Sequence, residues 1–211
     1  MTSLTLSLQF DPGRWHVVEP PQAPGAGFLF GWTVTPDPVD AGIPQPVARV
    51  LAEAAVSIGT VFFGGDADPY GEKGSQQIRF RRHWWRSSEL TVYRATSVET
   101  VLPAFDSARH DWSMNAQWLV VSDSSGLTPE TATVLKTLYA NWTLPDPWPA
   151  GIRMIIQSAI DGDAAACYVQ DPAAQESFIK AVHQSAVTAG MTVLRRHRGR
   201  SFTDSQSIKH E

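Results

Sequence analysis

The sequence predicts an α+β fold in which a mixed or antiparallel sheet packs against about four helices. Some segments alternate between apolar and polar residues, as half-buried strands do, and others repeat apolar residues every three or four positions, as amphipathic helices do. Residues 4–10 and 28–34 are of the alternating kind and predict two strands near the N-terminus. The proline- and glycine-rich segment 19–27 separates them and predicts a loop.

Four segments have the apolar spacing of helices that cover a core. The first is 44–58, and the second begins at Ser97, whose hydroxyl suits an N-cap, and extends to residue 108. The third and fourth begin with Thr128-Pro129 and Asp171-Pro172, pairs that combine an N-cap residue with proline at the first helical position. Each of these starts predicts a helix boundary from local chemistry alone.

The remaining strands are expected between and after these helices, at 76–82, 89–95, 118–121, 152–157, 165–169 and 192–196. The first two of them predict a hairpin. The run Trp118-Leu119-Val120-Val121 is apolar throughout, which predicts a central strand buried on both faces. Asp161-Gly162-Asp163 is a favourable hairpin turn between the strands on either side of it.

The order of these elements leaves two arrangements open. Residues 117–196 follow the β-α-β-β-α-β order of ferredoxin-like folds, and residues 28–122 can be divided in the same way. The chain is then either two related halves, 1–115 and 116–200, or one continuous mixed sheet. Both arrangements make residues 1–200 a single α+β domain with helices on one face of the sheet, because crossover connections are right-handed. The polar segment 201–211 is expected to be a flexible tail.

Composition indicates a globular chain with few charges. Hydrophobic residues make up 43% of the 211 residues, enough for a core, and the net charge of −4 makes duplex nucleic acid an unlikely main partner. The single cysteine, Cys167, excludes an intrachain disulfide and is expected in the core. The sequence has neither an apolar run of membrane-spanning length nor a signal-peptide pattern, so we expect a cytoplasmic protein, and its residue bias favours a bacterial origin.

The densest functional signal is Arg-Phe-Arg-Arg-His-Trp-Trp-Arg at 79–86. Its candidate partner-binding residues are Arg79, Arg81, Arg82, His83, Trp84, Trp85 and Arg86. If 76–82 is a strand, both tryptophans fall at the hairpin turn, and at least one is expected to be exposed. Arginine and tryptophan are enriched in the energetic centres of protein interfaces, so this segment predicts a partner-binding site. The alternative is a solvated hairpin end whose rings pack inward.

The loop 141–151 contributes a further candidate, Trp148. Three prolines stiffen this loop, and an exposed tryptophan on a rigid loop is typical of an interface anchor. The alternative is that the ring packs back onto the domain and holds the loop in place.

Catalytic and metal-binding patterns are absent from the sequence, and no cofactor is expected. Asp66 and Asp68 resemble the opening of a calcium loop, but Tyr70 and Gln77 occupy positions where oxygen ligands are needed. Together with His110, the two aspartates would suit a hydrolase or nuclease-like site. An enzyme therefore remains an alternative to the main hypothesis.

These observations favour a non-enzymatic protein-binding module of bacterial type, and an immunity protein that neutralises a toxin is one concrete form of it. The expected partner is another protein, either a toxin or an assembly partner, with no membrane contact. The alternatives are the enzyme described above, a small-anion or nucleotide-binding sensor that uses the arginines of 79–86, and a subunit of a larger assembly.

Overall fold

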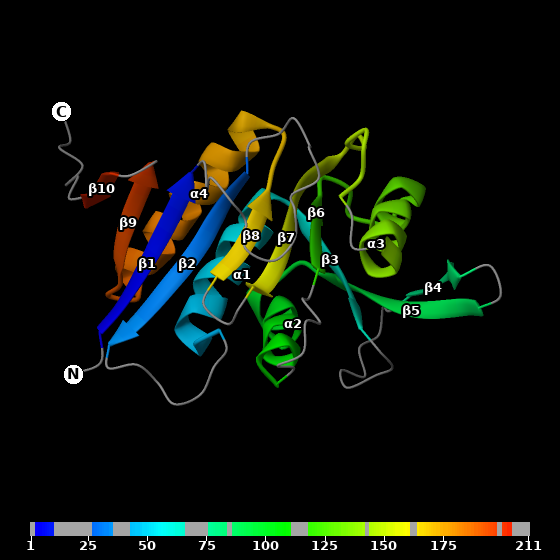
Figure 1. Cartoon of the computed structure of the whole chain (residues 1–211), viewed down its shortest axis with the longest axis horizontal. Helices are drawn as coiled ribbons and strands as arrows, with labels where there is room; N and C mark the ends of the chain where they lie inside the picture. The colour runs from blue at the N-terminus through cyan, green and yellow to red at the C-terminus, as the bar shows by residue number, and fades with distance from the viewer. Residues whose placement is uncertain are drawn as a thin grey trace.

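The computed structural model of the chain describes residues 3–10, 27–35, 43–65, 76–83, 86–110, 118–141, 144–160, 164–197 and 200–203. Within these ranges the chain forms four α-helices and ten strands, and all ten strands belong to one mixed sheet. The strand order is β10-β9-β1-β2-β8-β7-β6-β3-β5-β4. Figure 1 shows this sheet extending across the molecule, with β10 and β4 at its two edges. The predicted α+β class is confirmed.

Eight of the ten strands coincide with predicted ones, and β3 and β10 were not predicted. The run Val61-Phe62-Phe63 of β3 is short and ends in glycines, which favour a turn in the sequence. β10 includes residues 201–203, the beginning of the predicted tail. The strands are β1 Ser3–Phe10, β2 Gly27–Thr35, β3 Thr60–Gly65, β4 Gln76–His83, β5 Arg86–Ala95, β6 Trp118–Ser122, β7 Ile152–Ile160, β8 Ala164–Tyr168, β9 Thr192–His197 and β10 Arg200–Thr203.

The helices begin where local chemistry predicts. They are α1 Gln45–Ile58, α2 Val98–His110, α3 Pro129–Asn141 and α4 Pro172–Thr188. Thr128 caps α3, because its hydroxyl oxygen accepts the N–H of Thr131 at 3.2 Å. Asp171 caps α4, because its carboxylate accepts the N–H of Ala173 at 2.9 Å. Both N-caps are therefore as predicted.

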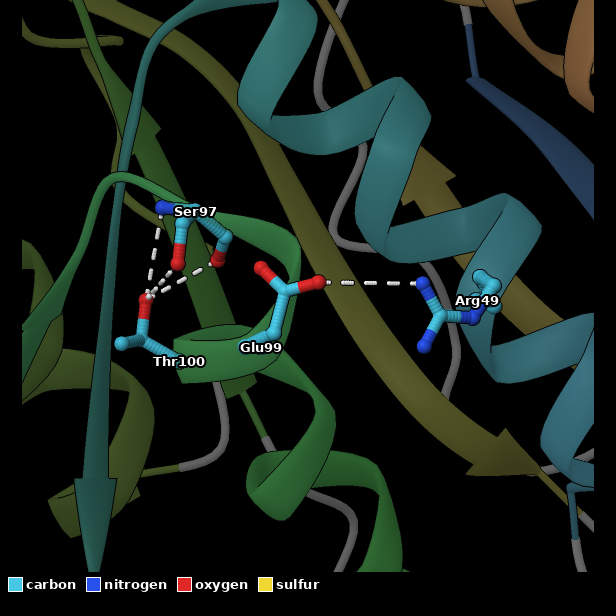
Figure 2. Close-up of polar contacts among 4 residues, drawn as sticks. All are labelled: Arg49, Ser97, Glu99 and Thr100. Atoms are coloured by element: carbon cyan, nitrogen blue, oxygen red, sulfur yellow. Dashed lines mark hydrogen bonds and ion pairs between the residues drawn. The ribbon is translucent and has the colours of Figure 1, made fainter.

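Ser97 directly precedes α2. Its carbonyl accepts the N–H of Val101 at 3.3 Å, and its hydroxyl lies 3.2 Å from the Thr100 hydroxyl. The Thr100 hydroxyl donates to the Ser97 carbonyl at 2.9 Å and accepts the Ser97 N–H at 3.3 Å. Figure 2 shows the contacts between Ser97 and Thr100 beside an ion pair between α1 and α2, in which Arg49 Nη1 and Glu99 Oε1 are 3.8 Å apart. Both of these charged side chains are exposed, so the pair contributes no more than about 1 kcal/mol to stability.

Three of the helices cover one face of the sheet because of how they connect their strands. α1 joins β2 to β3, α2 joins β5 to β6, and α4 joins β8 to β9, and in each case the two strands are parallel but not adjacent. All three crossovers have the same sense, so the right-handed rule places their helices on the same face. The expectation of helices on one face holds for these three.

α3 packs on the opposite face, which the sequence analysis did not predict. It joins β6 to β7, which are direct antiparallel neighbours, so the crossover rule does not apply to it. The two faces have separate cores. Phe105 of α2 and Phe178 of α4 belong to the larger core, and Leu135 and Leu138 of α3 belong to the smaller one. The strand between them, β6, is buried along its whole length, as predicted.

The division into two ferredoxin-like halves remains a prediction. Strands from both halves pair in the same sheet, and β1 lies between β2 and β9. Across the described helices, none combines the length and the apolar character needed to cross a membrane.

Candidate functional site

The β4–β5 hairpin forms one edge of the sheet and extends beyond its neighbour. β5 pairs with β3 only from Thr91, opposite Gly65, to Ala95, opposite Val61. The first half of β5, from Arg86 to Leu90, pairs with β4 and with no other described strand. Figure 1 shows the hairpin projecting from the sheet on the side of α3. We call residues 79–86 the free end of the hairpin.

The base of the hairpin is held in the core on the α3 face. Leu90 is buried there, and Ile78, its cross-strand partner, packs against the same cluster. Leu90 lies directly over Gly64 of β3, where an added Cβ would come within 2.6 Å of a Leu90 methyl group. Gly64 is held in turn by the Tyr139 hydroxyl, which accepts its N–H at 3.1 Å and donates to its carbonyl at 3.0 Å. The free end therefore extends from a fixed base.

Arg79 is the one arginine of the free end whose side chain the structure describes. It is directly opposite Glu89 in the hairpin, and its Nε donates to Glu89 Oε1 at 2.8 Å. The Arg79 side chain is 83% exposed and the Glu89 side chain 50%, so solvent screens this pair and its contribution to stability is about 1 kcal/mol at most. Glu89 was not singled out from the sequence. Its position opposite Arg79 depends on the bulge between Arg81 and His83, which the sequence did not predict.

The other predicted residues of the free end follow along the hairpin backbone. Arg81, Arg82 and His83 lie in β4, and a bulge between Arg81 and His83 shifts the register there. Arg86 begins β5 opposite His83. Trp84 and Trp85 lie outside the described residues. The structure therefore brings the predicted basic residues together at the end of one edge hairpin.

Trp148 lies at the other end of the sheet and has an internal role. Its indole N–H donates to the carbonyl of Ile152 at 2.8 Å, and its half-buried ring packs against the core on the α3 face. Ile152 begins β7 opposite Ser122, the last residue of β6, whereas the hairpin projects past the opposite end of β3. These contacts account for the position of Trp148, which lies away from the described residues of the hairpin.

The residues of the enzyme hypothesis are only partly described. Asp66 and Asp68 lie outside the described ranges, and His110 is the last residue of α2. The residues whose positions are described contain no group of three potential metal ligands. In the loop after β6, the hydroxyl of the buried Ser122 accepts the N–H of Ser124 at 3.1 Å.

Cys167 is a core residue, as the sequence predicts. It lies in β8, fully buried among the residues that face α1 and α4. Burial disfavours the thiolate and raises the pKa of the Cys167 thiol far above its usual range. The neutral buried thiol has neither the charge nor the access that a nucleophile needs.

We expect the Cys167 thiol to resist labelling for as long as the protein is folded. Treatment of the native protein with Ellman's reagent at pH 8 should label less than about a tenth of the thiol in an hour, because reaction requires opening of the core. The same sample in 6 M guanidinium chloride, the control, should react completely. Rapid stoichiometric labelling of the native protein would contradict the buried position.

Comparison with known proteins leaves the fold and the hairpin to be interpreted on their own. The chain matches no protein-family model, and it has no significant match among curated proteins or solved structures.

Proposed function

We propose that this chain is a non-enzymatic protein-binding module and that the free end of the β4–β5 hairpin contacts the partner. The observation that supports this most directly is the position of the arginine cluster on an edge hairpin that extends past β3. A surface that projects from the body of a domain can enter a concave site on another protein. Arginine at such a position provides planar, multidentate hydrogen bonding to carboxylates and backbone carbonyls.

The charge distribution also supports a partner-binding hairpin. Residues 76–95 contain five arginines and one glutamate, which gives them a formal charge of +4. The whole chain has a net charge of −4, so the rest of the chain has a net charge of −8. A basic hairpin on an acidic domain orients an approaching acidic protein toward the hairpin and disfavours docking on the acidic surfaces. The acidic remainder also repels nucleic acid phosphates, which makes a protein the better candidate partner.

A cytoplasmic immunity protein of bacterial type is the concrete form of this function that we propose. Proteins of this kind act by binding alone. The immediate consequence is a tight complex with one partner, in which the hairpin is buried.

The test is isolation of the one-to-one complex from the source cells, followed by calorimetric titration of the purified components. Trp84→Ala and Trp85→Ala should be made singly, and at least one should weaken binding tenfold or more, as expected for an interface hot spot. Val187→Ala is the control, because Val187 is exposed on α4, away from the hairpin, and should change affinity less than twofold. Affinity within threefold of the parent for both tryptophan variants would contradict the proposed site.

A further inference from the structure

Among the described strands, none pairs with the outer side of β4. β4 is the last strand in the sheet order, and on its inner side it pairs with β5. Alternate residues of an edge strand direct their N–H and C=O groups outward, where an extended segment of another chain can pair with them. The described strands include none on that outer side. From Gln76 to the bulge after Arg81 this edge is about 20 Å long, at roughly 3.3 Å per residue, which suits a strand of about six residues.

The charge of the hairpin indicates what kind of segment would pair there. Arg79, Arg81 and Arg82 lie on β4 itself, and Glu89, the one acidic residue of 76–95, already pairs with Arg79. A strand that carries carboxylates would meet an excess of positive charge at the end of the edge formed by Arg79, Arg81 and Arg82. A basic strand would meet the same excess and be repelled.

We infer that the β4 edge accepts an extended acidic segment of the partner, which adds to the sheet as a further strand. This inference rests on the proposed protein-binding function and specifies how the hairpin performs it. Main-chain hydrogen bonds supply affinity in this kind of recognition, and the alternating side chains supply selectivity. The arginines therefore select the acidic segment, and the edge itself binds its backbone.

The same arginines also suit a purely protective role. Charged residues on edge strands prevent sheets from joining edge to edge, and the opposite edge of this sheet is also basic, with Arg195 and Arg196 in β9 and Arg200 in β10. Protection and recognition make different predictions. A protective edge rejects every added strand, whereas a recognition edge binds an acidic strand and rejects a basic one.

The probe is a fluorescein-labelled peptide of five Glu-Val repeats, titrated with the full chain and followed by fluorescence anisotropy. We expect saturable binding with a Kd below about 100 µM in 20 mM salt, weakened at least tenfold in 500 mM salt because screening reduces the attraction. A peptide of five Lys-Val repeats is the matched control and should not bind. Absence of saturable binding by the acidic peptide, or equal binding by both peptides, would overturn the inference.

Two proline variants test whether the backbone edge itself is used. Gln76 and Gln77 are exposed and uncharged, and adjacent residues of a strand direct their N–H groups to opposite sides. One of Gln76→Pro and Gln77→Pro therefore removes an outward donor, and the other removes a donor on the β5 side. The first should weaken peptide binding at least fivefold with little change in Tm. Parent-like binding by both folded variants would show that the strand edge is not used.

The inference and the proposed function fail separately. If the isolated partner needs Trp84 or Trp85 but binds both proline variants with parent affinity, strand addition is wrong and the protein-binding function stands. If the tryptophan variants bind normally and one proline variant does not, the edge is the site and the predicted hot spot is wrong.

Discussion

Phe178→Ala should lower the free energy of unfolding by about 3–5 kcal/mol, the range for removing a large aromatic ring from a packed core. Phe178 is fully buried on the inner face of α4, and its ring centroid is 5.8 Å from that of Phe28 in β2. The contact fixes α4 to the middle of the sheet, between the two strands that the helix connects. Because helix and strand are both held by other contacts, the cavity left by alanine cannot close fully.

Chemical denaturation followed by far-UV circular dichroism measures this loss. For a chain of this length, each kcal/mol corresponds to roughly 2–4 °C in Tm, so the variant should melt roughly 6–20 °C below the parent. Val187→Ala provides a control on the same helix, because Val187 is 72% exposed and should change stability by less than about 0.5 kcal/mol. A loss below about 1 kcal/mol for Phe178→Ala would mean that α4 does not pack on β2 as described.

Helix boundaries were predictable because their causes are local. Thr128 and Asp171 each accept an N–H within the first turn of the helix that follows, so the signal and the structure lie within a few residues of each other. The same reasoning fails for β3. Its glycines resemble a turn in sequence, but Gly64 suits the strand because an added Cβ would come within 2.6 Å of a Leu90 methyl group. The Tyr139 hydroxyl holds the backbone of Gly64 at the same point. Leu90 and Tyr139 are distant in sequence, so no local pattern contains this information.

The hairpin was predictable in outline but not in register. His83 pairs with Arg86, and an unbroken ladder from that pair would place Arg79 opposite Leu90. The bulge between Arg81 and His83 shifts the pairing by one residue, so Arg79 faces Glu89 and Ile78 faces Leu90. Because of this shift, the apolar residues Ile78 and Leu90 face each other at the base of the hairpin, and the ion pair of Arg79 lies next to them. This register depends on the core beneath the hairpin and not on the turn residues.

The sheet order was the least predictable feature, because it depends on pairings between distant segments. β2 pairs with β8, and β1 with β9, across most of the chain length, and the alternating pattern of each strand specifies its buried face but not its neighbour. The position of the candidate site follows from this order. The arginine cluster is visible in the sequence, but only the sheet shows that it lies on an outermost strand.

Gly59→Ala should destabilise the fold by about 2–3 kcal/mol, although glycine-to-alanine changes at compatible positions commonly stabilise proteins by up to about 1 kcal/mol. Gly59 joins α1 to β3, and its extended backbone with φ of 169° is open to any residue, so the cost is steric. A Cβ at this position would lie 2.3 Å from the carbonyl oxygen of Ser122. That carbonyl belongs to β6, which pairs with β3 on one side and β7 on the other and cannot move away cheaply.

Gly126→Ala is the matched control, because the Cβ it would add meets no described atom within 4 Å beyond Gly126 itself and its two chain neighbours. Urea denaturation of both variants should show a loss for Gly59→Ala and a change below about 0.5 kcal/mol for Gly126→Ala. Equal stabilities would mean that the junction of α1 and β3 does not contact β6 this closely. Gly59 precedes β3 at the end opposite the hairpin, so the folded Gly59→Ala variant should bind the acidic peptide with parent affinity. Loss of stability without loss of binding would separate the central sheet, which maintains the fold, from the edge hairpin, where we propose that the partner binds.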